Sequence, residues 1–224
     1  MIKVVSFDVD NTLLDFFELK RIVCTQAVEA MIDAGLDMSE KKIMKELYEL
    51  YDKHGYEDHK IFNKLLRKLE GKIDYKKLSY GIVAYRKARV GMLDTYPGVK
   101  RTLIKLKEMG MRLIIISDAP ALQAWLRLAA VKIDDFFEFV IISGKNNKGT
   151  GKPFERALRK LKVKPEEVLH VGDWPERDVK GAEKIGVHSC FAKYGNTHLK
   201  GVKADYTIKD IKELVDVVKK ANKV

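Results

Sequence analysis

The residues Phe7-Asp8-Val9-Asp10-Asn11-Thr12 place two carboxylates and a hydroxyl directly after an apolar run, residues 2–7. That run is rich in β-branched and aromatic side chains and is short enough to form a buried strand. A strand that ends in Asp-x-Asp-x-Thr carries acids at its carboxyl edge, where open α/β sheets bind ligands. Two carboxylates this close repel each other unless a positive charge lies between them, and a hard divalent cation such as Mg²⁺ meets that need. The alternative is a surface turn with solvated acids, because Asp and Asn favour turns.

Two later segments offer groups that bind anions. Ser117 and Asp118 follow the apolar run 113–116 and precede a predicted helix start, where a hydroxyl and backbone amides can hold an anion. Lys152 lies at another predicted helix start, because the following Pro153 suits the first helical position. These groups could bind a phosphoryl group near the first acidic motif.

A late strand adds further acids. Asp173 follows the apolar run 168–171, and Asp178 comes five residues later. Because parallel strands end at the same edge of a sheet, we expect Asp173 to lie near the first motif. The combined set can bind Mg²⁺, bind a phosphoryl group and supply a nucleophile.

The segment between the first motif and Tyr96 is predicted to be helical. From about residue 18 to residue 92, apolar side chains recur three and four residues apart, as at Ile43, Leu47 and Leu50. Breaks near residues 35, 55–56 and 71 predict four helices joined by short loops.

The rest of the chain alternates between strand and helix patterns. The strands read as continuous apolar runs, which is typical of a parallel sheet covered on both faces. The predicted fold is therefore α/β, a Rossmann-like parallel sheet core with an inserted all-helical cap. We expect the core to comprise residues 1–15 and 95–224 and the cap residues 16–94. The remaining strand candidates are residues 113–116, 139–142, 168–171, 187–191 and 206–208.

Composition narrows the class of protein. The chain has 224 residues and a hydrophobic fraction of 46%, which supports a folded core. No apolar run reaches the roughly 20 residues that span a bilayer, and no signal-peptide pattern precedes the first strand. The two cysteines, Cys24 and Cys190, lie among apolar neighbours and predict buried thiols. Together these features predict a cytoplasmic protein, and the wealth of Lys and Glu resembles proteins from hot environments.

The net charge of +11 raises the possibility of a nucleic-acid partner. The stretch from Lys145 to Lys164 holds eight basic residues against the single acid Glu155. No nucleic-acid motif and no interleaved stacking aromatics accompany it, so we expect no nucleic-acid partner. The stretch is better suited to attract small anionic substrates.

Taken in order, the four motifs resemble the haloacid dehalogenase (HAD) superfamily, specifically its phosphatases with a helical cap inserted after the first motif. The motifs are Asp-x-Asp-x-Thr, the apolar strand with Ser117, the pair Lys152-Pro153 and the segment Gly172-Asp173 through Asp178. The resemblance extends over the whole chain. Residues 81–85 and the segment from Tyr96 onward are also similar to archaeal phosphatases that act on glyceraldehyde 3-phosphate.

The resemblance implies roles for the acids. Asp8 would be the nucleophile that forms an aspartyl-phosphate, and Asp10 would protonate the leaving oxygen and then activate water. Mg²⁺ would be held by Asp8, by the backbone carbonyl of Asp10 and by Asp173. Thr12 would support the loop around Asp10. The implied substrate is a small phosphate monoester such as a sugar phosphate.

It also implies roles for the phosphate-binding groups. Ser117 and the backbone amide of Asp118 would bind phosphoryl oxygens. Lys152 would neutralise charge between Asp8 and the phosphoryl group, with Asp178 orienting it. Many relatives have Asn where this chain has Asp118, and we expect its carboxylate to cap the following helix. Lys148 is a rival for the lysine role, and Lys152 is preferred because Pro153 completes the motif.

Three other functions compete with the phosphatase. A dehalogenase is disfavoured because such enzymes lack the second acid of the first motif, which is Asp10 here. A phosphomutase would use the same aspartyl-phosphate, and the sequence does not exclude it. A basic binding module without activity would not require Asp8 and Asp10 together. The sequence leaves the choice between monomer and homodimer open.

Overall fold

The first unit of the protein is built on a parallel sheet. The computed structural model describes residues 1–223, apart from the side chain of Val90. Val224, the last residue of the predicted core, lies outside the described residues. The sheet has six strands in the order β3-β2-β1-β4-β5-β6, and every neighbouring pair is parallel. This confirms the predicted Rossmann-like α/β fold. The strands are β1 (Val4–Phe7), β2 (Arg112–Ser117), β3 (Val140–Ile142), β4 (Val168–Gly172), β5 (His188–Ala192) and β6 (Tyr206–Ile208).

The strand order reverses at β1, which lies between β2 and β4. Phe7 at the end of β1 is in register with Ile115 on one side and Val171 on the other. The loops that leave β1, β2 and β4 therefore start side by side at one edge of the sheet. In open α/β sheets this crevice is the usual place for a ligand.

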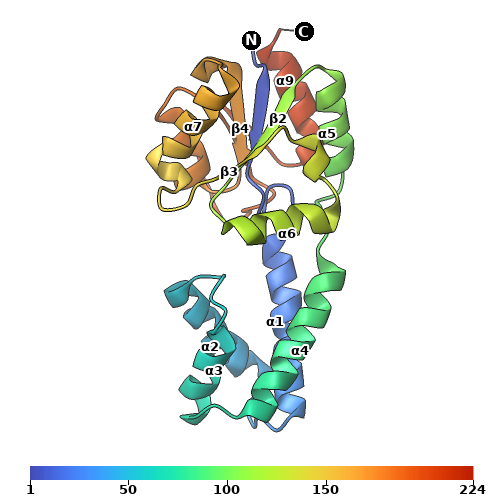
Figure 1. Ribbon diagram of the computed structural model, residues 1–224, viewed down its shortest axis with the longest axis vertical. Coiled ribbons are helices and arrows are strands. Elements are labelled where there is room, and N and C mark those ends of the chain that lie inside the picture. Colours follow the sequence, from blue (N-terminus) through green and yellow to red (C-terminus); the bar gives the residue numbers. More distant parts are fainter. Residues whose placement is uncertain (224) are drawn as a thin grey trace. The chain divides into compact units, whose positions relative to one another are not determined.

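Both faces of the sheet are covered, because its strands are apolar on both sides. Val5 and Phe7 pack into one buried cluster with side chains of α5 (Val99–Glu108) and α9 (Leu214–Ala221). Val4 packs into another with side chains of α7 (Lys152–Leu161). Figure 1 shows α7 on one side of the sheet and α5 and α9 on the other. The helices of this unit are α5 (Val99–Glu108), α6 (Ala121–Val131), α7 (Lys152–Leu161), α8 (Lys180–Glu183) and α9 (Leu214–Ala221).

Contacts within the chain define two compact units. The first comprises Met1–Phe16 and Leu93–Val224, and the second comprises Phe17–Met92. The second is built from helices, and its four helices agree with the four predicted from the apolar spacing. They are α1 (Phe16–Asp33), α2 (Glu40–His54), α3 (Ile61–Glu70) and α4 (Tyr75–Met92).

Apolar side chains at three- and four-residue spacing fill the interior of the second unit. Ile43 and Leu47 of α2 are buried, as are Ile61 and Leu65 of α3. None of the described helices is both long and apolar enough to cross a bilayer. Both cysteines are buried, as predicted.

Candidate active site

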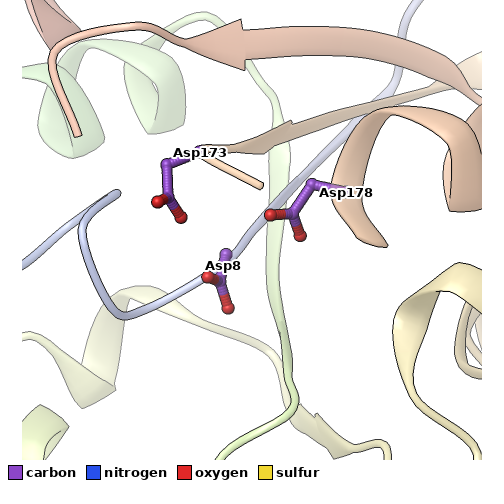
Figure 2. Close-up of side chains that lie close together, drawn as sticks. All are labelled: Asp8, Asp173 and Asp178. Atoms are coloured by element: carbon purple, nitrogen blue, oxygen red, sulfur yellow. The ribbon is translucent and has the colours of Figure 1, made fainter. Parts of the chain in front are cut away.

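Three carboxylates meet at the edge of the sheet where β1 and β4 end. Asp8 follows β1, Asp173 follows β4, and Asp178 lies on a short π-type turn, Pro175–Val179, after β4. One ligand oxygen from each lies within 4.8 Å of the others, and Figure 2 shows the three side chains close together. All three residues are buried, with exposed fractions of 8%, 2% and 1%. The predicted convergence of Asp8 and Asp173 is therefore present in the structure.

The cation beside these acids is Lys148. Its Nζ lies 2.7 Å from Oδ1 of Asp8 and 2.5 Å from Oδ1 of Asp178, and only 2% of its side chain is exposed. The sequence motif favoured Lys152 for this position, and the structure places Lys148 there instead. Lys152 begins α7, as predicted, and its side chain is exposed. Lys148 instead lies on the preceding 3-10 turn, Lys148–Thr150.

Asp118 holds that turn in place. Its Oδ1 accepts a hydrogen bond of 3.0 Å from the backbone N–H of Lys148, and its Oδ2 lies 3.5 Å from Nη1 of Arg177. We expected Asp118 to cap the helix that follows it. The structure differs, because α6 has Pro120 at its N-terminal cap position and no side-chain cap hydrogen bond there. The acid caps the lysine turn, which lies 30 residues along the chain.

Three polar contacts hold the side chain of Asp178. Its Oδ2 accepts from the backbone N–H of Trp174 at 2.9 Å, and its Oδ1 lies 3.0 Å from Nε2 of His170 besides contacting Lys148. Nδ1 of His170 is in turn 2.9 Å from Oγ of Ser6. Gly172 leaves the space that this side chain occupies, since a Cβ at position 172 would lie 2.2 Å from Cγ of Asp178. Both oxygens of Asp178 therefore have partners within the protein, and Oδ1 pairs this acid with Lys148.

Burial and neighbouring charges shift the pKa values of the four central groups, which are Asp8, Asp173, Asp178 and Lys148. Burial raises the pKa of Asp8 to about 7 despite the nearby Lys148, and it raises the pKa of Asp173 to about 9. Burial opposes ionisation of Asp178 as well, but Lys148 and His170 overcome it and hold the pKa of this acid below its usual range. Burial likewise opposes the charge on Lys148, yet Asp178 and Asp8 raise its pKa. Lys148 and Asp178 therefore form an ion pair, whereas Asp8 and Asp173 need additional positive charge before both ionise.

The donor set suits a hard divalent cation. Oδ2 of Asp173 is buried and has no hydrogen-bond partner among the residues that the structure describes. An unpaired carboxylate oxygen in such a place is costly unless a cation or a proton satisfies it. Carboxylate oxygens from Asp8 and Asp173 are the ligands that ions such as Mg²⁺ prefer. A cation there would also supply the charge that lets both acids ionise.

Asp10 lies in the loop after β1 and is held by an arginine that sequence reasoning missed. Nη1 of Arg127, on α6, lies 2.7 Å from Oδ2 of Asp10. Asn11 adopts a left-handed backbone conformation with φ of 56°, which Asn tolerates better than most residues. One signal could have revealed Arg127. It interrupts the buried stripe of α6 between Ala124 and Leu128.

Ser117 and Thr12, the two hydroxyl residues of the predicted site, differ in their hydrogen bonds. Ser117 ends β2, is buried, and accepts a hydrogen bond of 3.1 Å from the backbone N–H of Ala119. We expected Thr12 to support the loop around Asp10. Its carbonyl accepts a hydrogen bond of 2.7 Å from the hydroxyl of Tyr194. Oγ1 of Thr12 is buried without a hydrogen-bond partner within the described part of the chain.

The helical unit contains a pocket of its own. Its volume is about 290 Å³, and basic and aromatic side chains are prominent in its lining. The buried Lys20 donates to the backbone carbonyl of Tyr56 at 2.8 Å and to the hydroxyl of Tyr85 at 2.9 Å. Arg86 and Arg89 also line the pocket. Two acids, Glu57 and Asp58, line it as well, so it is a polar cavity that can accept a hydroxylated group.

Comparison with known proteins identifies the class. The family model for haloacid dehalogenase-like hydrolases matches residues 2–186, so the chain belongs to this family. It is 36% identical to a glyceraldehyde 3-phosphate phosphatase of Methanocaldococcus jannaschii, with all of both chains covered. It is 38% identical to the enzyme of the same name from Pyrococcus abyssi, over 87% of this chain and 83% of that one. These findings confirm the predicted superfamily and support a hydrolase that acts on phosphate esters.

Solved structures share the fold. A candidate β-phosphoglucomutase from Thermotoga maritima has a TM-score of 0.76 at 20% identity, with 98% of this chain and 99% of that chain covered. The HAD-type hydrolase YfnB from Bacillus subtilis, in a magnesium-bound form, has a TM-score of 0.70 at 19% identity, with 97% and 99% covered. At this level of identity the similarity supports the architecture alone.

Proposed function

We propose that this protein is a magnesium-dependent phosphatase that hydrolyses a small phosphate monoester through an aspartyl-phosphate on Asp8. The observation that carries the proposal is the position of Asp8, whose Oδ1 lies 2.7 Å from the buried Nζ of Lys148 beside the unpaired oxygen of Asp173. A carboxylate that attacks an anionic phosphate must be screened by positive charge. Lys148 supplies one such charge from the protein itself.

The reaction would proceed in two balanced steps. In the first, an oxygen of Asp8 bonds to phosphorus while the ester P–O bond breaks, and the leaving oxygen takes a proton from Asp10. In the second, water attacks the phosphorus of the aspartyl-phosphate, Asp10 takes its proton, and the bond to Asp8 breaks. The products are the alcohol and inorganic phosphate, and both acids return to their starting states.

Other residues would bind and orient the phosphoryl group. We propose that the Ser117 hydroxyl and the backbone amide of Asp118 donate to its oxygens. Lys148 takes the charge-neutralising role, with Asp178 orienting it. Mg²⁺, when bound by Asp8, Asp173 and the backbone carbonyl of Asp10, supplies positive charge that lowers the repulsion between nucleophile and phosphate.

The substrate class follows from the relatives and is part of the proposal. Phosphatases named for glyceraldehyde 3-phosphate match the full length of the chain, which supports this ester or a similar sugar phosphate. We propose that the unit Phe17–Met92 is a cap that reads the substrate. Its insertion directly after the Asp8 motif and its polar pocket support that role.

The decisive experiment compares wild type, Asp8→Asn and the exposed control Asp135→Asn. We expect p-nitrophenyl phosphate hydrolysis with Mg²⁺, loss of turnover with EDTA or in Asp8→Asn, and normal turnover in the control. Radiolabelled ester, quenched in acid during turnover, should leave label on wild type and none on Asp8→Asn. A panel of small phosphate esters that includes glyceraldehyde 3-phosphate then ranks the substrates. Wild type that is inactive with every ester and metal would refute the proposal.

A further inference from the structure

A buried arginine contacts the acid to which the proposed function assigns proton transfer. Arg127 is 2% exposed, and its Nη1 lies 2.7 Å from Oδ2 of Asp10, although the two residues are 117 positions apart in sequence. We propose that Arg127 is a positioning residue that aims the carboxyl group of Asp10 at the oxygen that gains or loses a proton. This inference rests on the proposed phosphatase function and adds a residue that none of the four sequence motifs contains.

Simple packing does not explain an arginine at this position. Arg127 lies on the buried face of α6, which it shares with the apolar Ala124, Leu128 and Val131 and with the polar Gln123. An aliphatic residue at position 127 would extend the apolar part of that face. Replacing a buried ion pair by apolar side chains is often neutral or even stabilising, so such a pair adds little to the stability of a core. The more specific consequence of this arginine is the fixed location of the Asp10 carboxyl group.

The guanidinium group is itself held by an aromatic ring. Cζ of Arg127 lies 4.3 Å from the ring centre of Phe16, which is the last residue of the first unit before the chain enters the helical unit. A guanidinium group over the face of an aromatic ring gains a cation–π attraction, which favours this location of the group. Arg127 therefore connects Asp10 to the point where the chain leaves the sheet unit.

The chemistry makes this role measurable. When the ester P–O bond breaks, its electron pair goes to the leaving oxygen. An alkyl ester would release a strongly basic alkoxide, so it needs the proton from Asp10, whereas a p-nitrophenyl ester releases a stable phenolate that needs it far less. General acid catalysis contributes roughly 10²- to 10⁴-fold for a reaction that depends on it. A misplaced Asp10 should therefore harm alkyl esters selectively.

The test measures kcat/KM for an alkyl ester, glycerol 3-phosphate or the best ester of the panel, and for p-nitrophenyl phosphate. The variants are Arg127→Met, Arg127→Lys and, as a control, the exposed Arg159→Met. We expect Arg127→Met to lower kcat/KM for the alkyl ester by about 10²-fold and for the aryl ester by less than about fivefold. Arg127→Lys keeps the charge without the planar fork and should recover part of the loss. Arg159→Met should leave both values unchanged.

The ratio of the two kcat/KM values is insensitive to partial unfolding, because a smaller fraction of active enzyme lowers both values equally. If Arg127→Met fails to fold, the ratio in Arg127→Lys carries the test, and a fall of more than about threefold would support the inference. A second support would be the absence of any further loss when Arg127→Met is combined with Asp10→Asn. An unchanged ratio in the folded variants would overturn the inference. That outcome is distinct from wild type without phosphatase activity, which would overturn the proposed function.

Discussion

Replacement of Lys148 by Met removes the cation between Asp8 and Asp178 while keeping most of the side-chain volume. The matched control is Lys152→Met, because Lys152 is the lysine that the sequence motif favoured and its side chain is exposed. The two variants therefore test whether activity depends on the lysine that matches the sequence motif or on the lysine that contacts Asp8 in the structure.

The distances allow the cost to be estimated. At 2.7 Å from Asp8 and 2.5 Å from Asp178, each contact is worth about 6 kcal/mol in gross Coulomb energy at an effective dielectric constant of about 20. Most of this gain is offset by the cost of burying the lysine. Removing one member of a buried ion pair costs roughly 3–5 kcal/mol. Asp8 can relieve part of that cost by binding a proton, since burial already raises its pKa to about 7.

We therefore expect Lys148→Met to lower the free energy of unfolding by about 3 kcal/mol, which a typical domain with about 5–15 kcal/mol survives. Its turnover of p-nitrophenyl phosphate with Mg²⁺ should fall at least about 10²- to 10³-fold, as for the loss of a single transition-state donor. Lys152→Met should change the free energy of unfolding by less than about 0.5 kcal/mol.

Urea denaturation in EDTA measures the stability, and steady-state kinetics of the folded variants measures turnover. Loss of activity in Lys152→Met together with normal activity in Lys148→Met would refute the assignment of the lysine. A Lys148→Met variant that is less stable but keeps full turnover would show that Lys148 stabilises the fold and does not take part in the reaction.

Two further predictions concern the same acids. Asp173 has a folded-state pKa of about 9 against 3.8 for the free side chain, so its protonated form stabilises the metal-free protein at low pH and that contribution is lost as pH rises toward 9. In EDTA the Tm of wild type should fall between pH 7 and pH 9, a window that lies above the range in which His170 titrates on unfolding. Addition of Mg²⁺, or the Asp173→Asn substitution, should make this fall of Tm less steep. Equal slopes of Tm against pH in wild type and Asp173→Asn would contradict the prediction. Gly172→Ala would place a Cβ 2.2 Å from Cγ of Asp178 and should cost about 1–3 kcal/mol in urea denaturation and also reduce turnover. The control Gly91→Ala, where a Cβ meets no atom within 4 Å, should be neutral or slightly stabilising, and a tolerated Gly172→Ala would show that Asp178 can shift without consequence.

Much of the architecture could be predicted from local sequence patterns. Continuous apolar runs predicted the strands, and apolar side chains at three- and four-residue spacing predicted the helices α1 to α4. Asp8 and Asp173 could be placed near each other for a related reason. Each follows a strand of one parallel sheet, and adjacent parallel strands end at the same edge.

Other parts of the site depended on contacts between distant segments. The pair Lys152-Pro153 correctly marked the start of α7, yet a helix start does not determine which nearby lysine points inward. Lys148 is held inward by contacts with distant residues, among them Asp8 and Asp118, which accepts a hydrogen bond from its backbone N–H across 30 residues of chain. A pattern of neighbouring residues carries no information about such a contact.

Arg127 shows the same limit. The sequence by itself determined that Asp10 would follow the first strand and that a helix would begin shortly after Asp118. Only the tertiary structure decided that Arg127 would reach Asp10 across 117 residues of chain. The physical reason is that backbone propensity and apolar periodicity act over one or two turns, whereas the pairing of buried charges is settled when separate elements pack together.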